Sequence, residues 1–299
     1  MRVDSVRLLG LDFADCDVAY AAEWVNARAA DAPFGYVVTP NADHFVRLHR
    51  QPGLVRAYEA ALLRLLDSRV VARTARLLGM PTPRVCPGSD LTAYLLTRCI
   101  QPGERIGIVG LEAPHVANLV QRLRIDRPLH YNPPQGFNLD PDLMQTVVDF
   151  VLKNPARLTF LATGSPRQEQ LAAAIAATGQ ARGTALCIGS SLAFAAGAVK
   201  RAPAWMQVMS LEWLHRLAQD PKRLWRRYLR DSPAVFSLLA QERMDRALKT
   251  KVPSRTALCA ARAQGFQYIN SLSFDAIAHQ TAPACGLPLP DHSRTRNPR

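Results

Sequence analysis

The strongest constraint on the fold is an alternation of two kinds of segment between about residues 34 and 189. Short runs rich in apolar and β-branched residues alternate with longer segments whose apolar residues recur at helical spacing. The expected strands are residues 34–39, 105–109, 158–163 and 184–188, with a weaker strand at 62–66. The alternation predicts an α/β fold, a mostly parallel sheet with helices on both faces. Ligands of such sheets bind beyond the carboxyl ends of the strands, so residues that follow a strand are the first candidates for a site.

Three helices of this region have recognisable starts. Ser89 precedes a helix expected at 90–100, Pro114 opens one at 115–123, and Asp140 with Pro141 opens one at 142–152. After residue 199 the pattern changes to closely spaced helices, expected at about 204–219 and 221–229, and after about residue 249 the periodicity fades. We therefore expect a body at 1–199, a helical basic appendage at 200–245 and a basic tail of low order at 246–299.

Composition and charge narrow the class of protein. Hydrophobic residues make up 48% and charged residues 20%, as in folded soluble proteins, and no apolar run is long enough to span a bilayer. Aspartates interrupt the first residues, so no secretory signal is expected and the chain should stay in the cytoplasm. The net charge of +13 is concentrated near the C-terminus, since residues 200–230 hold eight basic and two acidic side chains. Such an end fits phosphate, nucleic acid or a lipid surface, or a solvated face kept for solubility.

The sequence supports no metal site and implies no cofactor. Its six cysteines are far apart and read as reduced, buried side chains, and its seven histidines form no HxH or HExxH group. Asp15-Cys16-Asp17 has the DxD form of some metal sites, but its acids are placed to start a helix.

Polar residues follow the first two expected strands. Thr39 and Asn41 offer a hydroxyl and an amide that suit a sugar or a carbonyl, or else form a turn with a helix N-cap. Asp67 follows the weaker strand and is either a general base or an N-cap, and the local sequence favours the cap.

The run LATGSPRQEQL predicts a glycine-containing turn from a strand into a helix. Gly164 lets backbone N–H groups approach an anion, and Ser165 with Gln168 has the spacing of a capping box. The alternative is a well-capped helix that binds nothing.

Arginines and aromatic residues are interleaved between residues 201 and 230. Guanidinium groups bind diphosphate oxygens in pairs, and aromatic residues favour membrane interfaces or stacked bases. Arg216, Arg223 and Arg226 would share one face of a continuous helix, which favours a phosphate clamp, although Pro221 can bend that helix.

With these elements in place, the chain resembles the WecG/TagA/CpsF glycosyltransferases, glycosyltransferase family 26. The resemblance covers about two thirds of the chain. The matching elements are TPN at 39–41, Asp67, ARLLGMPTPRVCPGSDL at 75–91, GSPRQE at 164–169, IGSSLAFAAGAVKRAPAW at 188–205 and LEWLHRLAQDPKRLWRRYL at 211–229.

The resemblance implies an inverting enzyme with a Rossmann-like body that moves a sugar from a UDP-sugar to an undecaprenyl-diphosphate-linked saccharide. It implies peripheral attachment at the inner face of the membrane, in cell-surface or exopolysaccharide synthesis. Asp67 matches the proposed base and Arg84 a supporting polar position, as do Thr39, Asn41 and Gln168. Arg216, Arg223 and Arg226 match an appendage that closes over the site and contacts the diphosphate.

One departure from the family concerns the loop at Asp67. The family usually has glycines after the aspartate, as in DGxG, whereas this chain reads Asp67-Ser68-Arg69-Val70. A different loop shape here leaves the donor sugar open among N-acetylmannosamine, its uronic acid and glucose.

Two other functions compete with the glycosyltransferase hypothesis. A nucleic-acid-binding protein would explain the basic C-terminal region but leaves TPN, GSPRQE and RAPAW without a role. A nucleotide-dependent dehydrogenase is disfavoured because no GxGxxG follows an early strand. The expected partners are therefore a UDP-sugar, a polyprenyl-diphosphate-linked acceptor and an anionic membrane surface, without nucleic acid. The sequence leaves open whether the chain forms a homo-oligomer.

Overall fold

A computed structural model describes residues 3–126 and 128–251, without the side chains of residues 204, 223 and 249–251. Its central sheet has six parallel strands in the order β4-β3-β8-β7-β5-β6. The strands are β3 (Gly35–Val38), β4 (Leu63–Arg64), β5 (Gly107–Val109), β6 (Leu129–Tyr131), β7 (Leu158–Leu161) and β8 (Thr184–Cys187). All five strands expected from the sequence are present, which confirms the α/β fold class.

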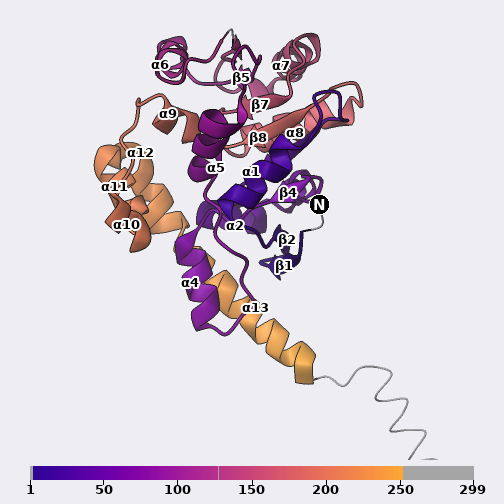
Figure 1. Ribbon diagram of the computed structural model, residues 1–299. Coiled ribbons are helices and arrows are strands. Elements are labelled where there is room, and N and C mark those ends of the chain that lie inside the picture. Colours follow the sequence, from indigo (N-terminus) through magenta and orange to yellow (C-terminus); the bar gives the residue numbers. More distant parts are fainter. Residues whose placement is uncertain (1–2, 127, 252–299) are drawn as a thin grey trace, which may run out of the picture. The chain divides into compact units, whose positions relative to one another are not determined.

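Helices cover both faces of the sheet, as the sequence predicts (Figure 1). One core includes residues of α1 (Val18–Asn26), α5 (Gly88–Tyr94), α6 (Ala113–Leu123) and α9 (Ser191–Ala195). The other includes residues of α2 (Ala42–Arg50), α3 (Val55–Glu59), α4 (Arg69–Leu77), α7 (Pro141–Lys153) and α8 (Arg167–Ala177). Successive strand residues join opposite cores because side chains alternate along a strand: Tyr36 and Val38 pack on one side and Val37 on the other.

Three strands were not expected from the sequence. β1 (Ser5–Leu8) and β2 (Leu11–Ala14) form a separate antiparallel hairpin, whose turn places Leu9 and Gly10 at positive φ. The third is β6, an edge strand of three half-buried residues. Charged residues interrupt β1 and β2, and β6 is a short strand that contains a histidine. These three strands therefore lack the continuous apolar run that predicts the other strands.

The predicted helix starts are close to the observed ones. The Asp140 carboxylate accepts hydrogen bonds from the backbone N–H groups of Asp142 and Leu143, which confirms it as the N-cap of α7. The helix α5 begins at Gly88, earlier than predicted, and continues as a π-helical turn at Leu95–Cys99.

The chain after residue 199 is more broken than the sequence predicts. The expected helix at 204–219 is two helices, α10 (Ala204–Val208) and α11 (Glu212–Gln219), because Ser210 lies at a positive φ of 64°. There follow α12 (Pro221–Trp225), a π-helical segment (Arg226–Asp231) and α13 (Ala234–Lys251). The described residues up to Asp245 form one compact unit, and a second unit begins at Arg246. The tail predicted at 246–299 lies outside the described residues from position 252 onward.

Two further expectations concern membranes and cysteines. Within the described ranges, no helix is both long enough and apolar enough to cross a bilayer. Cys16, Cys86, Cys99 and Cys187 are buried and form no disulfide, as expected, whereas Cys259 and Cys285 lie outside the described ranges.

The cap of α7 gives a test of the fold. We expect Asp140→Ala to lower the free energy of unfolding by about 1 kcal/mol, because two N–H groups of the first helical turn lose their acceptor. Urea denaturation measures the change. Glu112→Ala is the matched control, since Glu112 occupies the same position before α6 without a side-chain cap. An equal loss in both variants would contradict the capping role of Asp140.

Candidate active site

Two cavities meet at Asp67, beyond the carboxyl ends of β3, β4, β7 and β8. The first, the apolar cavity, has a volume of about 390 Å³ and includes Val70, Trp213, Val235 and Phe236 in its wall. The second, the polar cavity, has a volume of about 370 Å³ and is lined largely by hydroxyl, amide and charged side chains. The residues that line both are Asn41, Asp67, Arg216, Arg227 and Tyr228.

The backbone around Asp67 explains why its carboxylate is available for chemistry. The Asp67 N–H donates to the carbonyl oxygen of Pro40 at 2.9 Å, which ties the end of β4 to the loop after β3. The next residue, Ser68, is the N-cap of α4, and its hydroxyl accepts from the N–H of Val71 at 3.2 Å. The local expectation that Asp67 is a cap is therefore wrong, because Ser68 performs that role.

The surroundings of Asp67 favour its protonated form. Burial raises the pKa of this carboxyl to about 7, and the nearby Glu212 and Asp90 raise it as well. Arg216 and a hydrogen bond from the Gly88 backbone act in the opposite direction. A carboxyl whose pKa lies near neutrality can gain and lose a proton under physiological conditions, as a general base must.

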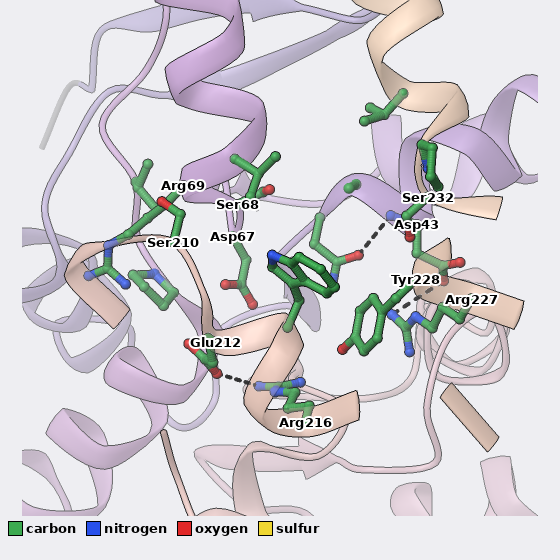
Figure 2. Close-up of a pocket in the computed structure, with 18 of the residues that line it drawn as sticks. Asp43, Asp67, Ser68, Arg69, Ser210, Glu212, Arg216, Arg227, Tyr228 and Ser232 are labelled. Atoms are coloured by element: carbon green, nitrogen blue, oxygen red, sulfur yellow. Dashed lines mark hydrogen bonds and ion pairs between the residues drawn. The ribbon is translucent and has the colours of Figure 1, made fainter. Parts of the chain in front are cut away.

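Arg216 comes from α11 and lies in the wall of both cavities, where Figure 2 shows it joined to Glu212, and its charge acts on the Asp67 carboxyl. Its Nη2 donates to Oε1 of Glu212 at 2.8 Å, and its guanidinium lies 4.7 Å from the centre of the Phe194 ring. Its Nε is buried and has no hydrogen-bond partner among the described residues. The side chain is thus held in place while its buried Nε stays available to a ligand.

Arg227 is a site residue that the sequence analysis missed. It lines both cavities, and its Nη2 lies 3.3 Å from Oδ2 of Asp43, which also accepts from Arg47. The spacing on a continuous helix, together with the family resemblance, favours Arg226 instead. In the structure, Arg227 is half-buried and paired with Asp43 of α2, whereas Arg226 is exposed.

The other two arginines of the predicted clamp lie differently. Arg226 is exposed, lies over the ring of Trp225 and is not among the residues that line either cavity. Arg223 belongs to α12, and its side chain is outside the described part of the structure. Their predicted contacts with a diphosphate stay predictions.

Thr39 and Asn41 lie in the wall of the polar cavity, as their place after β3 predicts. The Asn41 side chain also accepts from the N–H of Asp43 at 3.1 Å and so caps α2. The capping interpretation of this loop is confirmed, and because a capping side chain can also face a cavity, binding of a sugar or a carbonyl by Thr39 and Asn41 stays a prediction.

The GSPRQE turn lines the same cavity through Gly164, Ser165 and Gln168. Gly164 has a φ of 79°, a conformation that glycine adopts without strain. The capping box expected between Ser165 and Gln168 is absent, since α8 begins without a side-chain cap. The Ser165 hydroxyl instead accepts from Arg47 at 2.7 Å and lies 3.2 Å from the hydroxyl of Tyr58.

His44 is a second residue that the sequence analysis missed, since it looked only for metal-binding patterns among histidines. Its Nδ1 accepts from the N–H of Asn41 at 3.1 Å, and the ring lines the polar cavity. Burial, with help from Arg227 and Arg47, lowers its pKa well below the usual range. The neutral ring must then carry its proton on Nε2, which makes it a hydrogen-bond donor.

The apolar cavity contains hydrogen-bond donors that lack acceptors. Besides Nε of Arg216, these are Nε of Arg227 and Oγ of Ser210, both buried and without a partner in the described chain. Arg69 lines the cavity too and makes no hydrogen bond or ion pair with another described residue. An apolar wall with unpaired cationic donors fits a ligand that is part hydrocarbon and part anion.

The departure at Asp67-Ser68-Arg69-Val70 affects this apolar cavity. Ser68, Arg69 and Val70 all line it, and none of the three is among the residues that line the polar cavity. The changed loop therefore bears on whichever ligand occupies the apolar side.

Arg84 is the one predicted substrate-binding residue that the structure holds away from both cavities. It is exposed, and it forms ion pairs with Asp15 at 3.8 Å and Asp17 at 3.4 Å. Asp17 also caps α1, as expected for the DxD motif. In the described residues, no group of three His, Cys, Asp or Glu side chains is placed to hold a metal ion. The role predicted for Arg84 stays a prediction.

Comparison with known proteins gives two findings. The chain is 27% identical over 238 residues to an N-acetylglucosaminyldiphosphoundecaprenol N-acetyl-beta-D-mannosaminyltransferase of Bacillus spizizenii, a match that covers 78% of this chain and 90% of that protein. The model of the glycosyl transferase WecG/TagA/CpsF family matches residues 6–249, which include every described residue that lines the two cavities. This chain therefore belongs to the WecG/TagA/CpsF family of glycosyltransferases.

Proposed function

We propose that this protein transfers N-acetylmannosamine or a related hexose, with inversion, from a UDP-sugar to an undecaprenyl-diphosphate-linked saccharide in cell-surface polysaccharide synthesis. One observation carries the proposal: the Asp67 carboxyl lies where a polar and an apolar cavity meet. A direct transfer between two substrates needs one base with a binding site on each side. The name of the Bacillus relative, which acts on a lipid-linked acceptor, supports this choice of substrates.

The polar cavity is the proposed site of the UDP-sugar. Hydroxyl and amide groups of Thr39, Asn41 and Gln168 suit the hydroxyl groups of a sugar. Gly164 and Ser165, in the turn before α8, offer backbone N–H groups to a phosphate, which the dipole of this helix favours.

The apolar cavity is the proposed site of the acceptor. Its apolar wall suits the first isoprene units of a polyprenyl chain, while Arg216, Arg227 and Arg69 suit the diphosphate. Because Ser68 and Arg69 line this side, the departure from the family's glycines is expected to affect the acceptor more than the donor.

In the proposed reaction, the Asp67 carboxylate takes the proton of the acceptor hydroxyl as that oxygen bonds to the anomeric carbon. The bond from this carbon to the UDP oxygen breaks at the same time, UDP leaves with the electron pair, and the configuration inverts. Arg216 and Arg227 line both cavities, so their guanidinium groups can balance charge on the leaving diphosphate without a metal ion.

The surface of residues 200–230 supports attachment to an anionic membrane at its cytoplasmic face. Trp205, Val208 and Met209 are 62%, 62% and 57% exposed, and Trp225 and Leu229 are also exposed. Exposed basic residues lie in the same segment. Apolar side chains that enter the lipid, next to arginines that contact headgroups, fit peripheral binding.

A product assay tests this function. The full chain is incubated with a panel of UDP-sugars and a short-chain prenyl-diphosphate-linked N-acetylglucosamine, and the products are identified by mass spectrometry. We expect one UDP-sugar to add one hexose or N-acetylhexosamine to the acceptor, and EDTA to leave the rate unchanged. Binding of nucleic acid with a steep salt dependence, together with no transfer from any UDP-sugar, would instead favour the alternative function.

Replacement of the base should stop the transfer. We expect Asp67→Asn to lower kcat by about 100-fold or more while the fold is retained, because the amide cannot accept the proton. In the unchanged protein, kcat/KM should fall about tenfold per pH unit below about pH 7, since the carboxyl is then protonated. A rate that stays constant between pH 5 and pH 8 would contradict the role of Asp67 as base.

Arg216 should affect both the rate and this pH dependence. We expect Arg216→Ala to lower kcat by about 100-fold. It should also move the acidic limb of the pH profile to higher pH, because Arg216 holds the pKa of Asp67 down. Arg230→Ala, which removes an exposed arginine outside both cavities, is the control. Equal effects of the two variants would show that only the total charge of the appendage matters.

A further inference from the structure

Two buried polar side chains lie next to each other at the start of α8, behind the polar cavity. Gln168 is 2% exposed and Glu169 is 1% exposed. Gln168 contributes to the wall of the cavity, whereas Glu169 is not among the lining residues. Glu169 belongs to the GSPRQE element, but the proposed mechanism gives it no role.

Hydrogen bonds fix the Gln168 side chain in one orientation. Its Nε2 donates to Oε1 of Glu169 at 2.8 Å, and its Oε1 accepts from the backbone N–H of Gly189 at 2.8 Å. An amide could turn by half a rotation, but the N–H of Gly189 can only donate, and so the oxygen of Gln168 must face it.

This pair joins two loops that form the polar cavity. Gly164, Ser165 and Gln168 line it from the turn before α8, and residues 188–191 line it from the loop after β8. The Gln168 amide is a side-chain bridge between these loops, and Glu169 fixes the direction of the amide.

Burial of the Glu169 carboxyl group costs free energy, whereas burial of an apolar side chain that only filled space would not. Burial raises the pKa of its carboxyl, against smaller opposing effects of Gln168, Ser165 and Arg47. Its Oε2 is buried and has no hydrogen-bond partner in the described chain. An apolar side chain of similar size would avoid this desolvation, which points to a role for the remaining acceptor, Oε1.

We propose that Glu169 is a positioning residue for the donor substrate: its Oε1 orients the Gln168 amide, which holds the loops at 164–168 and 188–191 in the geometry that binds the UDP-sugar. This inference rests on the proposed function, in which the polar cavity takes the donor. It predicts a defect that is specific to the donor, because the apolar cavity shares neither loop.

The test compares two substitutions in the full-length protein. Glu169→Leu keeps most of the volume and removes the acceptor, whereas Glu169→Gln keeps an acceptor in the form of an amide oxygen. We expect Glu169→Leu to raise the KM for the UDP-sugar at least tenfold and to leave the KM for the acceptor within twofold. We expect Glu169→Gln to keep the donor KM within threefold of the unchanged protein.

A control separates positioning from simple loss of stability. Glu104→Leu removes a carboxylate that is paired with Arg157 at 2.7 Å, away from both cavities, and should lower Tm without changing either KM. An unchanged donor KM in Glu169→Leu, equal rises in both KM values, or a failure of Glu169→Gln to restore donor binding would each overturn the inference. If Glu169→Leu does not fold, Glu169→Met carries the same test, because it also removes the acceptor and keeps most of the volume, and the same donor defect is expected.

A second measurement does not depend on turnover. Hydrogen exchange followed by NMR should show slow exchange of the Gly189 N–H and the Gln168 side-chain amide in the unchanged protein and in Glu169→Gln. Exchange should be at least tenfold faster in Glu169→Leu. If the unchanged protein transfers no sugar, the proposed function fails, and the exchange rates still decide whether Glu169 holds Gln168. Equal exchange rates in all three proteins would overturn the inference.

Discussion

The chemistry of this site depends on a balance between the burial of one carboxyl and the charge of one guanidinium. Burial at the junction of the two cavities favours the protonated form of Asp67, and Arg216 opposes this effect. If burial acted alone, the carboxyl would be a stronger base but rarely ionised, and if the arginine dominated, it would be ionised but a weak base. A pKa of about 7 lies between these limits. The two groups are about 150 positions apart in the chain, so only the fold can set this balance.

Much of the basic excess that the sequence places after residue 199 has partners within the molecule. Arg201 pairs with Asp90, Arg227 with Asp43 and Arg216 with Glu212. Arg73 of α4 donates to the carbonyl oxygens of Val208 and Met209 and so holds the α10–α11 connection. The contacts with Asp90, Asp43 and Arg73 fasten the basic segment to the rest of the molecule, whereas the pair of Arg216 with Glu212 lies within α11. The ion pairs leave fewer cations for an anionic partner than the net charge indicates. The net charge therefore overstates how many arginines of this segment are available to an anionic partner.

The parts that could be predicted from the sequence are those that depend on short stretches of it. β3, β5, β7 and β8 are buried strands whose apolar runs separate them from the helices around them, and the Asp140 cap is set by adjacent residues. The meeting of Thr39, Asn41, Asp67 and Gln168 at one edge of the sheet followed from the rule for parallel sheets together with the family resemblance.

The remaining parts depend on contacts that no short stretch encodes. Asp67 could not be distinguished from a cap until Ser68 was seen to occupy that role. Arg226 was preferred to Arg227 because the family resemblance matched it, and the sequence does not show that Arg227 pairs with Asp43 of α2. His44 required knowledge of its burial and of its hydrogen bond from the N–H of Asn41.

Residues of the basic segment and of the preceding chain both line the cavities at Asp67, and this affects the pKa of its carboxyl. Trp213 and Arg216 of α11 line the cavity that holds Asp67, so part of the burial that raises the pKa of this carboxyl comes from the appendage. Without α11, water would reach the carboxylate and its pKa would fall toward the ordinary value for an aspartate. The same helix supplies the guanidinium that keeps the carboxyl from being fully protonated. Packing of residues 211–219 against the rest of the molecule thus contributes both to the burial that raises the pKa of Asp67 and to the charge that lowers it. Without these residues, the carboxylate would be a weaker base and would lack the charge of Arg216.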